Sequence, residues 1–246
     1  MSFYDEMRNV VLRHGAINNP YLDRFKRGDL SDKDVRVFAM EFYNFARFFP
    51  KILVSQLVNT EDETVADELT KVLYSELGDG HTKNRHELLY RDFLRSVGID
   101  VHEAIARPML PSTRAYIEGM EQLYSDGNHA KALGASFGLE NMAIPMWDHL
   151  IPGLIVLKRT RYPQMDITYF TFHRQLESTH EAAMEQAMAA VGGTNDTSRA
   201  GMSEKEKEDF RYGVTAVLDY LEGFWMGLER NQPNLPRSAR ERHEAA

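Results

Sequence analysis

His173, Glu177 and His180 share one face of a predicted helix in the segment FTFHRQLESTHEAAM. At about 100° per residue, the i, i+4, i+7 spacing places the three side chains within roughly 60° of one another. Two imidazoles and a carboxylate with open coordination positions are typical of non-haem iron sites, and manganese or zinc accept the same donors. The trio therefore indicates about half of a metal centre.

The alternative interpretation of this trio is a solvated helix face, where His and Glu bind nothing. Most neighbouring side chains are apolar, which favours burial of the helix; they are Tyr169, Phe170, Phe172, Leu176, Ala182, Ala183, Met184, Ala187 and Met188. A buried glutamate between two histidines is costly unless it has partners. A metal ion would provide a partner for all three groups.

Three further donors lie elsewhere in the chain. Glu76 ends one predicted helix and His86 begins the next, and each taken alone reads as a solvated residue at a helix end. Glu140 lies in ALGASFGLENMAIPMW among small and apolar residues, so we expect it to be buried. Buried carboxylates are paired or bind metals, and bundles with two metal ions use glutamates and histidines from facing helices.

Hydrophobic periodicity near 3.6 residues predicts helices along nearly the whole chain and no strand. The predicted helices cover 31–58, 63–77, 83–97, 111–127, 130–149, 163–191 and 203–230. Pro50 is expected to kink or divide the first of these helices, Pro152 to kink or end the fifth, and Pro163 to open the sixth. Gly78 and Gly80 follow the second helix as a stop signal. The segment GGTNDTSRAG reads as a loop.

These patterns predict an all-α, single-domain bundle of about seven main helices over residues 1–230, with a disordered tail over 231–246. The chain has 246 residues, a formal net charge of −8 and no cysteine. The charge argues against a nucleic-acid surface, and the lack of cysteine excludes thiolate ligands and nucleophiles. No signal peptide or membrane span is visible, so we expect a soluble, cytoplasmic protein whose metals are bound by nitrogen and oxygen.

The order of these motifs resembles a known family. ELGDG, a histidine ten residues after its glutamate, a lone buried glutamate and then H-x3-E-x2-H are similar to the haem-oxygenase-like di-iron oxidases and oxygenases. The resemblance extends from His14 and NPYLDRFKRGDL to His180 and implies the seven-helix fold shared with thiaminase-type proteins and pyrroloquinoline-quinone synthase. It places the metal ligands, which are also the catalytic residues, at Glu76, His86, Glu140, His173, Glu177 and His180.

Two points of the resemblance stay open. The family more often has Asp where this chain has Glu177, whose longer side chain can change how the second metal is held. His81 follows the same Gly-rich turn as His86 and is the alternative ligand. We favour His86 because it stands at the start of a helix.

The resemblance implies two Fe(II) ions per chain and O2 as co-substrate. The implied reaction is N-oxygenation, C–C cleavage or rearrangement of an amine or amino-acid-derived small molecule in specialised metabolism. The alternatives are a fatty-acid-type oxidative decarboxylase, a cofactor-free oxidase, or a non-catalytic interaction protein of the same fold.

Aromatic residues of two helices are candidates for the substrate pocket, although core packing is the more common use of such residues. The candidates are Phe42, Phe45, Phe49, Tyr169 and Phe172. Arg174, or Arg47, could pair with a substrate carboxylate.

Two activities of the same fold fit less well. A thiamin-degrading hydrolase requires a cysteine, which this chain lacks. A haem-degrading enzyme would use His14 as its proximal ligand and would leave the other donors without a role. We also expect a homodimer, with Trp225 and the apolar last helix as a candidate surface.

Overall fold

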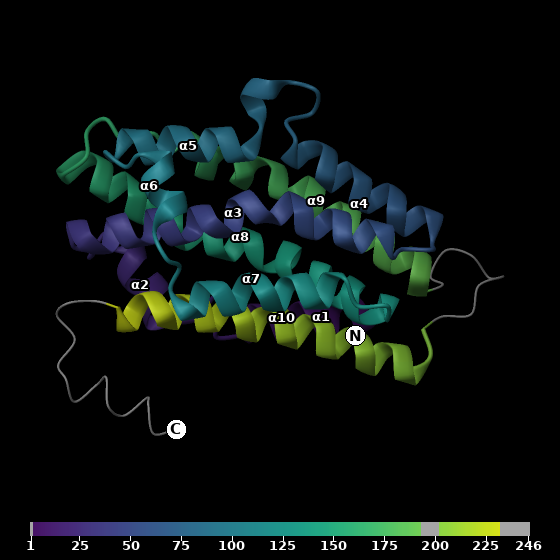
Figure 1. The fold of residues 1–246 in the computed structure, drawn as a ribbon. Coiled ribbons are helices and arrows are strands. Elements are labelled where there is room, and N and C mark those ends of the chain that lie inside the picture. The colour runs from purple at the N-terminus through teal and green to yellow at the C-terminus, as the bar shows by residue number, and fades with distance from the viewer. Residues whose placement is uncertain (1, 193–201, 232–246) are drawn as a thin grey trace.

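The computed structural model describes residues 2–192 and 202–231, and this part of the chain contains helices and no strand (Figure 1). In chain order the elements are α1 (Phe3–Arg13), α2 (Pro20–Lys26), α3 (Asp32–Val58), α4 (Glu63–Glu76), the 3₁₀ helix η1 (Thr82–Asn84), α5 (His86–Ser96), α6 (Val101–Ala106), α7 (Pro111–Tyr124), α8 (His129–Thr160), α9 (Thr168–Gly192) and α10 (Glu204–Arg230). The all-α prediction is confirmed. The expected loop over 192–201 and the tail over 231–246 lie almost entirely outside the described residues.

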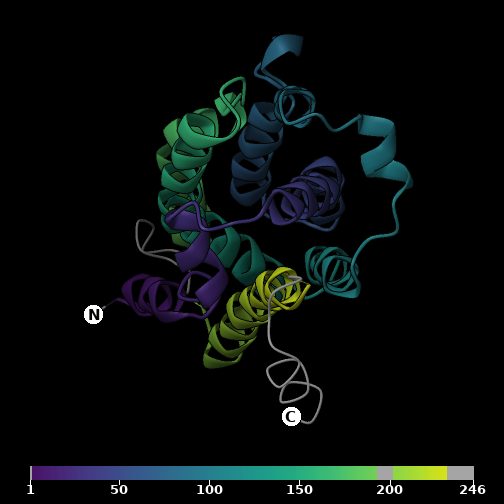
Figure 2. The ribbon, with the colours of Figure 1, turned by 90° about the vertical axis from the view of Figure 1, so that its left-hand side faces the viewer.

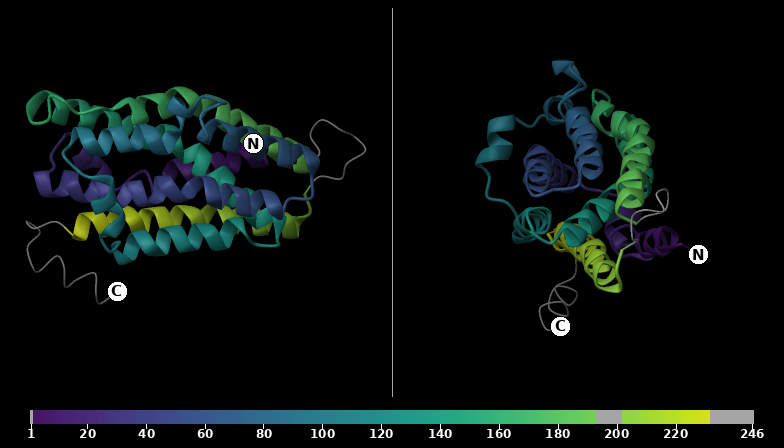
Figure 3. Two further views of the ribbon diagram at one scale, coloured as in Figure 1. Left: turned by 45° about the horizontal axis from the view of Figure 1, so that its top comes forward. Right: turned by 90° about the vertical axis from the view of Figure 1, so that its right-hand side faces the viewer.

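The long helices run roughly along one axis. Seen along that axis, α3 lies inside a ring of helices and contacts α4, α5, α6 and α7 (Figure 2). The helices α7 and α10 run side by side, and α8 packs against both α9 and α10 (Figure 3). Within the described residues, none of these helices is apolar over a stretch long enough to span a bilayer.

Helix α3 lies at the centre of the bundle because its apolar side chains point in most directions around the helix axis. Ser31 caps its first turn by accepting a hydrogen bond from the backbone of Asp34, whose carboxylate in turn accepts from the backbone of Ser31. The helix continues without interruption past Pro50, so the expected division there is wrong. Burial of Phe49 and Leu53 on either side shows that packing holds this turn although proline removes one backbone hydrogen bond.

Two other helix boundaries differ from the prediction. Helix α8 continues past Pro152 to Thr160, again inside the packed bundle. Helix α9 begins at Thr168 and not at Pro163. Just before it, the carboxylate of Asp166 accepts a hydrogen bond from the backbone N–H of Thr168, as in an Asx turn. The helices α1, α2 and α6 were also missing from the prediction. With 7 and 6 residues, α2 and α6 have too few turns to show a clear periodicity, whereas the 11 residues of α1 carried a periodic signal that was overlooked.

Trp225 lies in the core and is fully buried, with its ring stacked on that of Tyr21 at 5.7 Å between centroids. It therefore does not supply a dimer surface, which corrects the expectation from the sequence. A helix stripe has the same appearance in the sequence whether its partner is its own chain or a second copy.

Helices α8 and α10 approach each other closely at two glycines. An added methyl group at Gly213 would lie 2.0 Å from the carbonyl oxygen of Lys131, and one at Gly134 would lie 2.2 Å from that of Phe210. Only glycine permits this contact, because a backbone oxygen cannot move aside as a flexible side chain can. The contact matters for the site because α8 also carries Glu140.

Replacing Gly213 by alanine should lower the free energy of unfolding by about 2–3 kcal/mol, the cost of overpacking a tight contact. Gly223→Ala in the same helix is the matched control, because nothing lies within 4 Å of the added methyl group. Alanine should there raise helix stability by about 0.5–1 kcal/mol. Urea unfolding followed by circular dichroism measures both, and equal effects of the two variants would contradict the close packing.

Candidate metal centre

A tight turn brings Glu76 and His86 together. Glu76 is the last residue of α4, and His86 is the first residue of α5. Between them Gly78, Asp79 and Gly80 all have positive φ, at 94°, 52° and 78°. Glycine adopts this conformation without a steric penalty, so the ELGDG motif reverses the chain within a few residues.

The structure gathers Glu76, His86 and His173 into one buried cluster, called here the donor cluster. Oε2 of Glu76 lies 2.9 Å from Nδ1 of His86, and Oε1 lies 3.8 Å from Nε2 of His173. The two imidazole rings have centroids 4.1 Å apart. All three residues are at most 6 % exposed, so the cluster lies in the interior. His81, by contrast, has an exposed side chain.

The charge of Glu76 is stabilised by the two imidazoles. Burial alone would raise the pKa of this carboxyl, but its interactions with His86 and His173 outweigh burial and hold the pKa well below its usual range. Glu76 is therefore an ionised acceptor at neutral pH, as a metal ligand must be.

Hydrogen bonding in the donor cluster is incomplete. Neither ring nitrogen of His86 makes a hydrogen bond, because its close approach to Glu76 is poorly aligned for one. In His173, Nδ1 lies 2.8 Å from the backbone oxygen of Tyr169. An N–H donated to that carbonyl leaves the lone pair of Nε2 facing the cluster, which is the usual arrangement of a metal-bound histidine.

The donor cluster therefore fits a metal ion. Buried polar nitrogens without hydrogen bonds are rare, and a cation would bind one ring nitrogen of His86, Nε2 of His173 and the carboxylate of Glu76 together. Two imidazoles and a carboxylate match the preference of iron for mixed nitrogen and oxygen donors.

Glu140 lies on α8 and faces the same small cavity as Glu76 and His173. It is 5 % exposed, and it contributes with burial to a raised pKa of Tyr116 beside it. The expected burial of Glu140 is thus present in the structure. Its role as a ligand stays a prediction.

The cavity has a volume of about 40 Å³ and an apolar lining around the carboxylates. Besides Glu76, Glu140 and His173, three of the residues predicted for the substrate pocket line it, namely Phe45, Phe49 and Tyr169. The remaining apolar lining residues are Ala46, Leu139, Met142, Ala143, Met146 and Trp147. Trp147 also packs on the ring of His173, with 5.3 Å between centroids.

Sequence reasoning missed Trp147 and the two methionines. Ala143 and Trp147 follow Glu140 by three and seven residues, the spacing that places side chains on one helix face. This signal was present in the sequence. It would have identified the α8 wall of the cavity.

Three residues predicted for the pocket lie elsewhere. Phe42 is a core residue whose ring contacts those of Tyr90 and Trp225. Phe172 packs edge-on against His86 outside the cavity, with centroids 5.6 Å apart. Arg174 pairs with Asp148 at the surface, 2.9 Å apart, and its guanidinium is thereby held away from the cavity.

Glu177 and His180 lie in α9, but their side chains are outside the described residues. Their roles as ligands stay predictions. His14, the ligand of the haem alternative, points toward α10, where its Nε2 lies 3.2 Å from Asp219.

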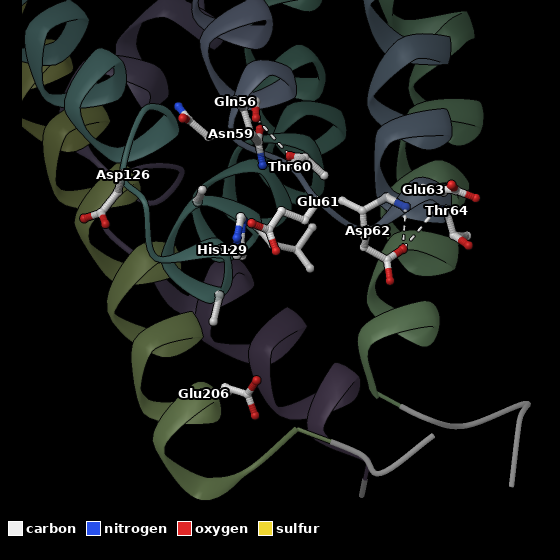
Figure 4. Close-up of a pocket in the computed structure, with 14 residues that line it drawn as sticks. Gln56, Asn59, Thr60, Glu61, Asp62, Glu63, Thr64, Asp126, His129 and Glu206 are labelled. Atoms are coloured by element: carbon white, nitrogen blue, oxygen red, sulfur yellow. Dashed lines mark hydrogen bonds between the residues drawn. The ribbon is translucent and has the colours of Figure 1, made fainter. Parts of the chain in front are cut away.

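A larger cavity of about 730 Å³ lies near the turns that join α3 to α4 and α7 to α8 (Figure 4). Its labelled residues include Glu61, Asp126, His129 and Glu206, and it contains none of the six predicted ligands. Size alone therefore does not identify the chemical site of this molecule.

Comparison with known proteins points in the same direction as the geometry. A family described as iron-containing redox enzymes, within the haem-oxygenase-like group, matches residues 36–205, which include Glu76, His86, Glu140 and His173.

Two curated relatives and one solved structure illustrate the similarity. The chain is 27 % identical to 4-chloro-allylglycine synthase of Streptantibioticus cattleyicolor over 92 % of its own length and 82 % of that protein. It is 21 % identical to 4-aminobenzoate synthase of Chlamydia muridarum, over 87 % and 88 % of the two chains. A CADD-like protein of unknown function from Nostoc punctiforme has the same fold, with a TM-score of 0.75 and 17 % identity over 92 % and 95 % of the two chains.

Proposed function

Because this chain belongs to the iron-containing redox enzymes of the haem-oxygenase-like group, we propose that it binds two Fe(II) ions and uses O2 to oxidise an amine or amino-acid-derived small molecule. The donor cluster is the observation that supports this proposal most directly. Glu76, His86 and His173 would hold one ion, and Glu140, Glu177 and His180 would complete the site for the second.

The names of the relatives support the substrate class. One forms a substituted allylglycine, which is an amino acid, and the other forms an aromatic amino acid, 4-aminobenzoate. Both products combine an amine with a carboxylate. We therefore place the substrate of this chain among amines and amino acids.

Iron bound by these donors supplies the redox chemistry that activates O2. The residues of the chain position that chemistry and keep water out. Nδ1 of His173 is held by the carbonyl of Tyr169, which fixes the direction of Nε2. The apolar wall formed by Phe45, Leu139 and Trp147 excludes solvent, so that oxidising equivalents reach the substrate.

The volume of the cavity constrains substrate entry. About 40 Å³ is close to the space occupied by one water molecule and is too small for an amino acid. Met142 and Met146 line the cavity, and methionine side chains change conformation at low cost. We propose that substrate binding displaces these two side chains.

Anaerobic titration with Fe(II), followed by exposure to O2, tests the proposal. We expect about two iron ions per chain, as for other bundles that carry two metals. Oxygen uptake should accelerate when the correct amine or amino acid is added to the iron-loaded protein. A protein that keeps its helicity but binds no iron would overturn the proposal.

A further inference from the structure

A row of oxidisable rings leads away from the donor cluster. The ring of Tyr169 lies 4.2 Å from that of His173 and 6.1 Å from Trp147, measured between centroids. Tyr90 lies 4.7 Å from Tyr169, and Tyr43 lies 5.8 Å from Tyr90. Electron transfer slows steeply with distance, so rings in contact form a path that more widely spaced rings do not.

Tyr43 ends this row with a partner that favours its oxidation. Its hydroxyl donates to Oε1 of Glu87 at 2.6 Å, and Nε of Arg91 donates to the same oxygen. The hydroxyl of Tyr90 donates instead to the backbone oxygen of Ala39 at 3.1 Å. A phenol releases its proton when it loses an electron, and a carboxylate accepts that proton far better than a backbone carbonyl does.

The proton stays on Tyr43 until oxidation occurs. Burial and the hydrogen bond to Glu87 raise the pKa of this phenol to about 12, so it is neutral at physiological pH. Oxidation at Tyr43 therefore moves an electron and a proton together.

A groove of about 510 Å³ is lined by Tyr43 and Glu87. Tyr43 is 0 % exposed, so its ring forms the buried floor of the groove, and the partly buried Glu87 lies beside it. Apart from Glu87, the charged residues that line it are all basic; they are Arg47, Lys51, Arg85 and Arg91. The whole chain carries a formal charge of −8, so this basic groove differs in sign from the protein as a whole. It would concentrate small anions near Tyr43.

We infer that Tyr43 is the redox-active end of this row of rings and is oxidised by oxidising equivalents from the donor cluster. An anionic one-electron reductant bound in the basic groove then reduces Tyr43 again. The inference rests on the proposed function, which supplies the oxidising equivalents. In each event Tyr43 loses one electron through Tyr90 and Tyr169, its O–H proton moves to Glu87, and a neutral tyrosyl radical remains. The reductant then returns one electron, and the proton returns from Glu87.

This path protects the interior. When no substrate is bound, an oxidising equivalent would otherwise attack Trp147 or Tyr169, which contact His173 directly. Transfer to Tyr43 moves the damaging radical to the wall of the basic groove, where a reductant bound in the groove can return an electron across the contact without touching the buried ring.

Laser photoionisation of tryptophan in metal-free protein tests the path independently of iron. In a Trp225→Phe background Trp147 is the single tryptophan, because the chain has two. We expect its radical to decay into a tyrosyl radical, and we expect Tyr43→Phe to lose that tyrosyl signal. Tyr162→Phe is the matched control, since Tyr162 also donates to a carboxylate, that of Asp32 at 2.7 Å, but contacts none of the rings in the row. Full tyrosyl yield in Tyr43→Phe, or its loss in Tyr162→Phe, would overturn the inference.

A second experiment uses iron-loaded protein exposed to O2 without substrate. Electron paramagnetic resonance should show a tyrosyl radical that Tyr43→Phe lacks, and mass spectrometry should find more oxygen adducts on Trp147 in that variant. Re-reduction of the radical by ascorbate should be about threefold slower in Lys51→Glu, because the groove loses positive charge. If the protein binds iron but forms no Tyr43-dependent radical, the inference is overturned and the proposed function stands. If the protein binds no iron, the proposed function is overturned, and the photoionisation result then decides whether electrons move along the row of rings to Tyr43.

Discussion

His173→Ala should lower the affinity of the protein for Fe(II) by more than about 100-fold, since loss of a supporting partner alone costs 10- to 100-fold. The imidazole supplies Nε2, which lies 3.8 Å from the carboxylate of Glu76. No neighbouring side chain can replace that nitrogen at the same point. Anaerobic titration with Fe(II) and a chelator competitor measures the change, and circular dichroism checks that helicity persists.

Arg174→Ala is the matched control for this experiment. It alters the next residue of α9, but its side chain is engaged with Asp148 at the surface. We expect it to bind iron like the unaltered chain. If His173→Ala keeps full iron affinity, or if both variants lose it equally, the assignment of the donor cluster is wrong.

Glu140→Gln should reduce the iron content from about two ions to about one per chain, because an amide carries no charge and is a weaker ligand than a carboxylate. Oxygen uptake with substrate should fall at least about tenfold, since the reaction is proposed to need both ions. The replacement preserves the size of a side chain that is 5 % exposed, so the fold should survive. Iron analysis and an oxygen electrode provide the two measurements.

Glu41→Gln controls for the loss of a buried carboxylate. Glu41 is 1 % exposed and accepts a hydrogen bond from the backbone of Leu110 at 3.1 Å, away from the donor cluster. Its replacement should cost some stability and leave the iron content unchanged. Two irons per chain in Glu140→Gln would remove Glu140 from the ligand set.

The helices were predictable because their signals are local. The capping boxes at Ser31 and Ser203 and the glycines after Glu76 each act within a few residues. Pro50 does not divide α3 and Pro152 does not end α8, whereas the kinks expected as the alternative at both positions stay predictions. In both helices the surrounding bundle outweighs the loss of a backbone hydrogen bond.

The donor types were predictable, but their arrangement was not. The resemblance identified Glu76, His86 and His173, and the structure brings these residues together. Among the aromatic residues, periodicity could not distinguish Phe45, which lines the cavity, from Phe42, which packs in the core. Both lie on buried parts of one helix, and the difference depends on which neighbouring helix each ring meets.

The sequence by itself determined that the chain is helical, has no thiol chemistry, and carries nitrogen and oxygen donors at spacings suited to iron. These properties follow from residue type and from separations of a few residues. Only the tertiary structure decided that Glu76 meets both His86 and His173, that Arg174 pairs with Asp148, and that a row of rings joins His173 to Tyr43. Such contacts join residues far apart in the chain, and packing of the helices alone sets which of them touch.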